Sequence, residues 1–299
     1  MQVWRAFAKI NLELSVLGRR PDGYHAVHTL LQATDLHDEI WVSPSEQFRF
    51  TSSREPADES NLVVRAVRAF EQQTSVSVGL HLDLRKRIPE RAGLGGGSSD
   101  AAVTLMGLDR YFRTRIPGEE MMRMLSRLGS DVPFFWVGGL AVAVGRGDVI
   151  FPMPDPAPVW HLLACPRIGI DTAEAYSWLT QTPESNNILS FCARFVPELG
   201  TVRPGYGARL NDFEGPLFRR FPELAELKRK LLAAGARFAA LTGSGSALFG
   251  EFESEAAARQ AAEALGGGDG PEAETIVVRP LGRQEYFGRM FDASWTRSV

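Results

Sequence analysis

The segment GLGGGSSDAA, Gly93–Ala102, places four glycines and two serines directly before a run of helix-forming residues. Glycine allows a ligand to approach the backbone closely, and the start of a helix offers N–H groups and the positive end of its dipole. Alternating leucines predict a strand at Leu80–Leu84, and helical spacing predicts a helix after the glycines, with Ser98, Ser99 and Asp100 as candidates for its N-cap. This order of strand, loop and helix predicts a phosphate-binding loop.

Two common phosphate-binding motifs do not fit this loop. A Walker loop ends in Gly-Lys-Ser or Gly-Lys-Thr, whereas Gly97 is followed by Ser98. A G-x-G-x-x-G motif that starts at Gly93 reaches Ser98 where its third glycine belongs. The alternative is a flexible turn without a ligand. Because the loop lies between a strand and a helix, we expect it to bind phosphate in a form that neither motif describes.

Lys9, Asn11 and Asp131 have side chains that a phosphoryl-transfer site needs. Alternation predicts a half-buried strand at Ala8–Val16, with Lys9 and Asn11 on the polar side, which faces away from the core. A lysine in such a position is more often solvated surface than a catalytic group. Asp131 stands directly before an apolar run, and its alternative role is the N-cap of the following helix.

The length of 299 residues and the hydrophobic content of 44% are sufficient for two domains. Strand-like and helix-like segments are mixed along the whole chain, so we predict an α/β (α+β) fold. The run FPMPDPAP, Phe151–Pro158, has proline at every second position and cannot lie inside a helix or a central strand. We therefore predict an N-terminal nucleotide-binding domain at residues 1–153 and a C-terminal, substrate-binding domain at residues 154–299.

Charge and hydropathy exclude several classes of partner. The net charge is −3 and the basic residues are scattered, so we expect no nucleic-acid partner. The longest charge-free apolar stretch, Phe134–Gly145, is too short to span a bilayer, so we expect no membrane partner. Cys165 and Cys192 match no zinc or disulfide pattern, which is typical of a reducing compartment and predicts a cytoplasmic protein. The sequence does not distinguish a monomer from a homodimer.

Four segments resemble one enzyme family. The stretch PERAGLGGGSSDAA resembles the phosphate loop of the GHMP kinases, the superfamily of galactokinase, homoserine kinase, mevalonate kinase and phosphomevalonate kinase. The stretches FAKINLELSVLGRRPDGYHAV, LGSDVPFFWVGGLAVAVGRGD and LTGSGSALFG resemble one branch of it, the 4-diphosphocytidyl-2-C-methyl-D-erythritol kinases. The resemblance implies a two-domain GHMP kinase fold with the active site in the interdomain cleft. It also implies ATP-dependent phosphorylation of the 2-hydroxyl of a cytidine-diphosphate-linked sugar alcohol, a step of non-mevalonate (MEP) isoprenoid biosynthesis.

The resemblance also implies roles for individual residues. Asp131 is implied as the catalytic base, and Lys9 as the cation beside the reacting hydroxyl or a nearby phosphate. The implied ATP-binding residues are Asn61, Pro89, Gly93, Leu94, Gly95, Gly96, Gly97, Ser98 and Ser99. The implied substrate-binding residues, with the aromatic ones at the cytosine base, are Asn11, Tyr24, His25, Tyr176, Gly243 and Ser244. Mg²⁺ is expected with ATP because it neutralises the phosphates, but no motif identifies its protein ligands.

Several alternatives stay open from the sequence. Asn61 also fits the N-cap of a helix, Tyr176 fits core packing, and Gly243 and Ser244 fit a plain turn. Asp100 places a negative charge beside the phosphate loop, which requires that it cap the helix or point outward. Two alternative functions are a GHMP kinase for a smaller alcohol, such as homoserine or mevalonate, and a superfamily member that senses a ligand without turnover.

Overall fold

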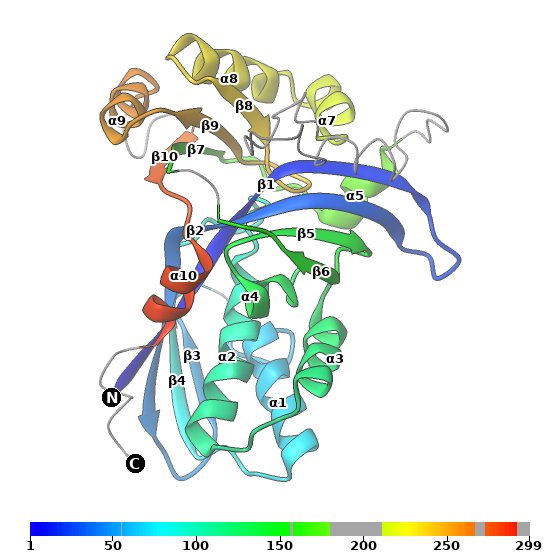
Figure 1. Ribbon diagram of the computed structural model, residues 1–299, viewed down its shortest axis with the longest axis vertical. Coiled ribbons are helices and arrows are strands. Elements are labelled where there is room, and N and C mark those ends of the chain that lie inside the picture. Colours follow the sequence, from blue (N-terminus) through cyan, green and yellow to red (C-terminus); the bar gives the residue numbers. More distant parts are fainter. Residues whose placement is uncertain (55, 156–157, 180–210, 267–272, 292–299) are drawn as a thin grey trace.

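The computed structural model describes residues 1–299 except 55, 156–157, 180–210, 267–272 and 292–299. Its strands form two sheets toward opposite ends of the molecule (Figure 1). The long strands β1 (Gln2–Arg19) and β2 (His25–Pro44) extend from the first sheet to the base of the second part (Figure 1). The mixture of strands and helices confirms the predicted α/β (α+β) class.

The first part of the chain contains, besides β1 and β2, the strands β3 (Arg49–Ser52), β4 (Leu80–Arg85), β5 (Leu140–Gly145) and β6 (Val149–Pro152) and the helices α1 (Leu62–Thr74), α2 (Gly96–Phe112), α3 (Gly118–Leu128) and α4 (Phe134–Val137). The sheet order is β3–β4–β2–β5–β6, with β1 antiparallel to β2. Helices α1, α2 and α3 cover one side of this sheet (Figure 1). Gly107 lets α2 approach β1 closely, because a Cβ at this position would lie 2.5 Å from the Trp4 ring.

The second part contains the strands β7 (Trp160–Pro166), β8 (Phe238–Leu241), β9 (Leu248–Phe252) and β10 (Ala273–Val278) and the helices α5 (Thr172–Ser177), α7 (Glu214–Arg220), α8 (Pro222–Ala233) and α9 (Glu255–Ala264). Its antiparallel sheet has the order β10–β7–β9–β8. Helices α8 and α9 lie on the outer side of this sheet, away from the first part (Figure 1). The division into domains at residues 153 and 154 falls between the two sheets and stays a prediction.

Strand β1 takes part in both cores. Phe7 packs in the core of the first sheet, and Leu14 packs in the core of the second. The prediction that Lys9 and Asn11 face away from the core was wrong, since Lys9 exposes 2% of its surface and Asn11 exposes 3%. The second part of the chain covers the polar side of the strand, where the Asn11 backbone N–H donates to Thr242 Oγ1 at 3.0 Å. Alternation within one strand carries no information about such a distant segment.

Helix α2 begins at Gly96, earlier than the sequence predicts. Its N-cap is Gly95, which has a left-handed conformation with φ of 73°. Glycine takes this conformation without a steric penalty, so the helix starts as soon as the chain leaves the loop. The prediction that Ser98, Ser99 or Asp100 caps the helix was therefore wrong, and these residues lie inside its first two turns.

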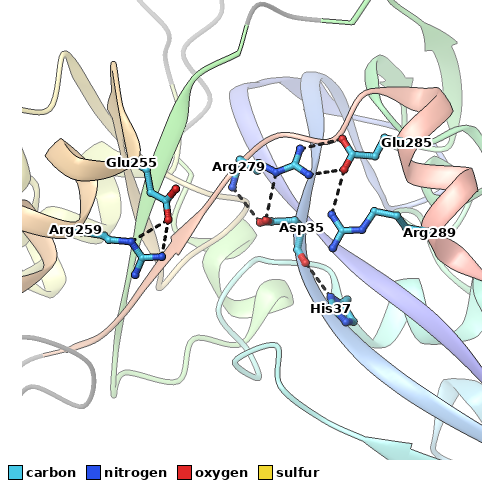
Figure 2. A network of polar contacts seen from close by, with 7 residues as sticks. All are labelled: Asp35, His37, Glu255, Arg259, Arg279, Glu285 and Arg289. Atoms are coloured by element: carbon cyan, nitrogen blue, oxygen red, sulfur yellow. Dashed lines mark hydrogen bonds and ion pairs between the residues drawn. The ribbon is translucent and has the colours of Figure 1, made fainter.

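Arg279 marks the place where the chain returns from β10 to the first part and forms α10 (Arg283–Met290). Its guanidinium lies between Asp35 of β2 and Glu285 of α10, with Nε 3.8 Å from Asp35 Oδ2 and Nη1 donating to Glu285 Oε2 at 2.9 Å (Figure 2). Hydrogen bonding from Arg279 lowers the pKa of Glu285. Arg289 also pairs with Glu285 at 3.3 Å, within α10 itself (Figure 2). Arg279 thus links α10 to Asp35 of β2 by charge.

None of the helices in the described parts of the chain has both the length and the hydropathy that crossing a bilayer requires. Cys165 is buried in β7, and burial raises the pKa of its thiol to about 12. It therefore remains a neutral thiol that packs as a small apolar residue. Cys192 lies outside the described residues.

Candidate active site

A cavity of about 580 Å³ lies where β1, the glycine-rich loop and segments of the second part meet. Of the residues predicted for the site, its lining includes Lys9, Asn11, Pro89, Gly93, Leu94, Gly95, Gly96, Gly97, Ser98, Asp131, Tyr176, Gly243 and Ser244. Four other predicted residues do not line this cavity, namely Tyr24, His25, Asn61 and Ser99. The fold therefore gathers most of the predicted residues from distant segments around one space.

Lys9 and Asp131 form an ion pair in the wall of this cavity. The Lys9 Nζ lies 3.4 Å from Asp131 Oδ2, and it also donates to Asn11 Oδ1 at 2.5 Å and to the Gly93 carbonyl at 2.8 Å. The Lys9 side chain is buried, whereas the Asp131 side chain is 43% exposed. The buried Lys9 ammonium thus pairs with an Asp131 carboxylate that is accessible to a molecule in the cavity.

The segment that carries Asp131 is a tight turn before the short helix α4. Its N-cap position is Pro133, with no side-chain capping hydrogen bond, so the alternative role of Asp131 as a cap was wrong. The Tyr286 hydroxyl of α10 donates to the Phe135 carbonyl at 2.7 Å and supports this segment from behind. Burial of Tyr286 raises the pKa of its hydroxyl, which therefore stays a proton donor. The Asp131 side chain is consequently free of a capping role and turns toward Lys9.

Gly93 and Gly95 are required by the protein's own packing. A Cβ on Gly93 would lie 2.2 Å from the Thr242 carbonyl oxygen, and both glycines have positive φ. A Cβ on Gly95 would lie 2.9 Å from Phe135 Cζ and 3.0 Å from Lys9 Cγ. The absence of side chains thus lets the loop close against Lys9 and the turn that follows β8.

The surroundings of Gly96 and Gly97 differ from those of Gly93 and Gly95. A Cβ on Gly96 would approach Lys86 Nζ to 3.1 Å and Ile88 Cγ2 to 3.2 Å, behind the loop. Among the described residues, a Cβ on Gly97 meets only Leu62 Cδ1, at an ordinary contact distance of 3.8 Å. Of the four glycines, Gly97 is therefore the one whose surroundings leave room for a ligand.

A buried charge cluster lies beneath the loop. The Lys86 Nζ is 2.6 Å from Asp38 Oδ2 and 2.7 Å from Asp100 Oδ2, and all three side chains are nearly inaccessible. Asp38 also accepts hydrogen bonds from the Arg87 and Ile88 backbone N–H groups. The expectation that Asp100 caps the helix or points outward was wrong, because its carboxylate turns inward to Lys86. This cluster ties β2, the end of β4 and the first turns of α2 together.

The turn after β8 closes the other side of the cavity. Thr242 contacts Asn11, and the Ser244 hydroxyl lies 3.1 Å from Thr172 Oγ1 at the start of α5. The Gly243 carbonyl accepts a hydrogen bond from Asn211 at 2.9 Å. The turn is therefore fixed to β1 and to the second part at the same time.

Three aromatic side chains gather beside the cavity. The rings of His25 and Tyr176 stack with a centroid separation of 4.8 Å, and Tyr176 packs edge-on against Phe213 at 4.9 Å. Burial lowers the pKa of His25 and raises the pKa of Tyr176. Tyr24 is 53% exposed, and the Arg146 guanidinium lies 4.9 Å from the centre of its ring. His25 and Tyr176 are thus neighbours, whereas the Tyr24 ring contacts Arg146, and of these three predicted residues only Tyr176 lines the cavity.

Asn61 and Ser99 are held by the protein itself. Asn61 is the N-cap of α1, and its side chain accepts a hydrogen bond from the Val63 N–H at 2.9 Å, so its alternative role as a cap is confirmed. Ser99 is completely buried in α2. A nucleotide-binding role for either residue stays a prediction.

Sequence reasoning missed Lys86, Arg91, Thr172 and Thr242, which line the cavity or contact its lining. Lys86 and Arg91 lie in the segment between β4 and the glycines, so their position beside the predicted loop was an available signal. Thr172 and Thr242 come from the second part of the chain, and no local pattern connects them to the loop.

Comparison with known proteins identifies the family. The family model described as GHMP kinases N terminal domain matches residues 61–139, and the model described as GHMP kinases C terminal matches residues 205–268. A relative from Solibacter usitatus (strain Ellin6076), named 4-diphosphocytidyl-2-C-methyl-D-erythritol kinase, is 38% identical over 99% of this chain and 92% of its own length. The chain belongs to the 4-diphosphocytidyl-2-C-methyl-D-erythritol kinase family.

Solved structures agree with membership of this kinase family. A crystal structure named 4-(cytidine 5'-diphospho)-2C-methyl-D-erythritol kinase has a TM-score of 0.79 and 35% identity, and the match covers 94% of this chain and 99% of that one. A homoserine kinase from Cytophaga hutchinsonii, with a TM-score of 0.71 and 19% identity over 96% of each chain, shares the fold alone. The predicted GHMP kinase fold and family are confirmed, and this protein is an ATP-dependent kinase rather than a sensor without turnover.

Proposed function

We propose that this protein transfers the γ-phosphoryl group of ATP to the 2-hydroxyl of 4-diphosphocytidyl-2-C-methyl-D-erythritol, a step of isoprenoid precursor biosynthesis. The observation that carries the proposal is the Lys9–Asp131 pair, at 3.4 Å, in the wall of a cavity that the glycine-rich loop also lines. Phosphoryl transfer depends mainly on positioning and on stabilisation of charge, and this cavity combines a carboxylate, a cation and backbone N–H groups.

In this proposal the Asp131 carboxylate accepts the proton of the acceptor hydroxyl as the hydroxyl oxygen attacks the γ-phosphorus. The bond from that phosphorus to the β–γ bridging oxygen breaks, and ADP leaves with the electron pair. Lys9 orients Asp131 and places its positive charge beside the transferred group. Because Asn11 Oδ1 and the Gly93 carbonyl fix the Lys9 Nζ, and because its side chain is buried, its field is strong and preorganised.

We assign the nucleotide to the part of the cavity lined by Pro89 and the glycine-rich loop, where the start of α2 favours phosphate. When bound with ATP, Mg²⁺ neutralises part of the phosphate charge. This ion prefers oxygen ligands, and the Ser98 and Ser244 hydroxyls line the cavity. Within the described ranges, no three His, Cys, Asp or Glu side chains could hold a metal ion. We therefore expect phosphate and water oxygens to provide most of its ligands.

We assign recognition of the cytosine base to Tyr24, His25 and Tyr176. Stacking of a base on an aromatic ring contributes about 1–3 kcal/mol. The stacked rings of His25 and Tyr176 are too close for a base to lie between them, so we expect the base to stack on the outside of this pair. Gly243, Ser244 and Asn11 would then hold the sugar alcohol near Lys9.

Calorimetric binding of CDP, compared with UDP, tests the substrate class. We expect CDP to bind more tightly than UDP and the preference to disappear in His25→Ala. A protein that binds ATP but shows no preference between the two nucleotides would contradict the cytidine-linked substrate. A panel of small alcohols, including homoserine and mevalonate, would then identify the acceptor.

A coupled assay of ADP release tests the catalytic pair. Lys9→Met and Asp131→Asn should each lower kcat by roughly 10²–10⁴-fold, because each removes one charge that acts on the reacting atoms. Glu119→Gln, an exposed carboxylate of α3 outside the cavity lining, is the matched control and should keep normal kcat. Normal turnover in Asp131→Asn would exclude Asp131 as the base.

A further inference from the structure

The cavity lining contains three cations, and two of them are already paired. Lys9 is bound to Asp131 and Asn11, and Lys86 lies between two buried carboxylates. The third is Arg91, whose side chain is exposed. In the part of the chain that the structure describes, no carboxylate lies within ion-pairing distance of the Arg91 guanidinium. Arg91 is therefore the cation that the lining offers to a ligand.

Arg91 lies at the junction of two spaces. Besides the main cavity, it lines an adjoining cavity of about 180 Å³ together with Gly93, Ile170, Asp171, Thr172 and Gly245. Its backbone is left-handed, with φ of 52°, a conformation that an arginine rarely adopts. The next residue, Ala92, is buried, and its carbonyl accepts a hydrogen bond from the Ala247 N–H at 3.3 Å. Tertiary packing thus imposes this conformation on the loop and holds the arginine at the cavity edge.

Apart from Arg91, the charged side chains at the main cavity and their ion-pair partners sum to a net negative charge. Lys9 and Asp131 cancel, and Lys86 is outnumbered by its two carboxylate partners. Glu90 adds a further negative charge to the lining. Without Arg91, the side chains would therefore present net negative charge to a polyphosphate. A planar guanidinium with several N–H donors binds phosphate oxygens with two parallel hydrogen bonds and supplies the missing charge.

We propose that Arg91 binds the polyphosphate of the nucleotide, an inference that rests on the proposed kinase function. Arg91 belongs to the same loop as the glycines that lead into α2, and only Ala92 separates it from Gly93. This continuity places it with the nucleotide phosphates rather than with the aromatic residues assigned to the acceptor. The guanidinium and the loop N–H groups then hold the phosphates from two sides.

Isothermal titration calorimetry of ATP, ADP and adenosine in the presence of Mg²⁺ tests this proposal. Arg91→Met removes the charged guanidinium and keeps an unbranched apolar stem, and it should weaken ATP and ADP binding by roughly 10- to 100-fold while adenosine binds as in the wild type. Arg91→Lys should restore part of the affinity. Arg87→Met is the matched control, because Arg87 lies in the same segment, pairs with Glu39 and lines neither cavity.

The outcomes separate this proposal from the proposed function. If the wild type binds no ATP, the kinase proposal fails. If the wild type binds ATP and Arg91→Met binds it equally well, only the role of Arg91 is overturned. Equal losses for adenosine and ATP would show a distorted loop instead of a lost phosphate contact and would also overturn it. A loss for CDP without a loss for ATP would place Arg91 at the acceptor and overturn its assignment to the nucleotide.

Discussion

Gly95 allows a sharp test of what the glycine-rich loop does. Glycines in such loops are expected to make room for phosphate, but a Cβ on Gly95 would point at Phe135 Cζ, 2.9 Å away, and at Lys9 Cγ, 3.0 Å away. Gly95→Ala should therefore disturb Lys9, the proposed catalytic cation, and the fold. Nucleotide binding should be affected less, since the methyl group does not enter the space for the phosphates.

The expected loss of stability in Gly95→Ala is the sum of two free-energy costs, backbone strain and overpacking. An alanine with the φ of +73° found here costs about 1–2 kcal/mol. Overpacking against the Phe135 ring and the Lys9 stem adds about 1–3 kcal/mol. The free energy of unfolding should fall by about 2–5 kcal/mol if these terms add. A displacement of Lys9 by about 1 Å should lower kcat roughly 100-fold.

Gly97→Ala is the matched control because the same methyl group meets only ordinary contact with Leu62. In a helix, alanine in place of glycine should raise the free energy of unfolding by about 0.5–1 kcal/mol. The added methyl lies at the cavity wall, so the KM for ATP should rise while kcat is kept. Urea denaturation and steady-state kinetics measure both variants. Normal stability and kcat in Gly95→Ala would refute the packing argument. A higher KM for ATP with normal stability and normal kcat would also refute it.

Two further perturbations concern buried and exposed charges. Lys86→Met should lower the free energy of unfolding by about 3–5 kcal/mol in urea, because Asp38 and Asp100 would keep buried charge without their cation. An unchanged free energy of unfolding in Lys86→Met would refute the stabilising role of this buried charge cluster. For Glu285, the lowered folded-state pKa means that its pairing with Arg279 stabilises above the ordinary glutamate pKa and is lost as pH falls through the folded value. Glu285→Gln should flatten the acid side of a thermal stability profile below about pH 4.3, and an unchanged profile would contradict this.

Asp100 and Lys9 show where sequence reasoning failed. Both stand in patterns that were interpreted correctly as a helix after a loop and as a strand, yet both side chains are buried. Their contact partners, Lys86 for Asp100 and the Gly93 carbonyl and Asp131 for Lys9, come from other segments. A period of two or of 3.6 residues reports which side of its own element a residue occupies, and it does not report what covers that side.

The sequence by itself determined the loop between a strand and a helix, the shared side of Lys9 and Asn11, and the family. These features depend on local conformational preferences or on ordered motifs, both of which can be read along the chain. Only the tertiary structure decided that Lys9 meets Asp131, that Gly93, Gly95 and Gly96 face protein atoms, and which lining cation has no carboxylate partner among the described residues. Such contacts join distant segments, and they arise from the packing of two sheets around β1 rather than from any local pattern.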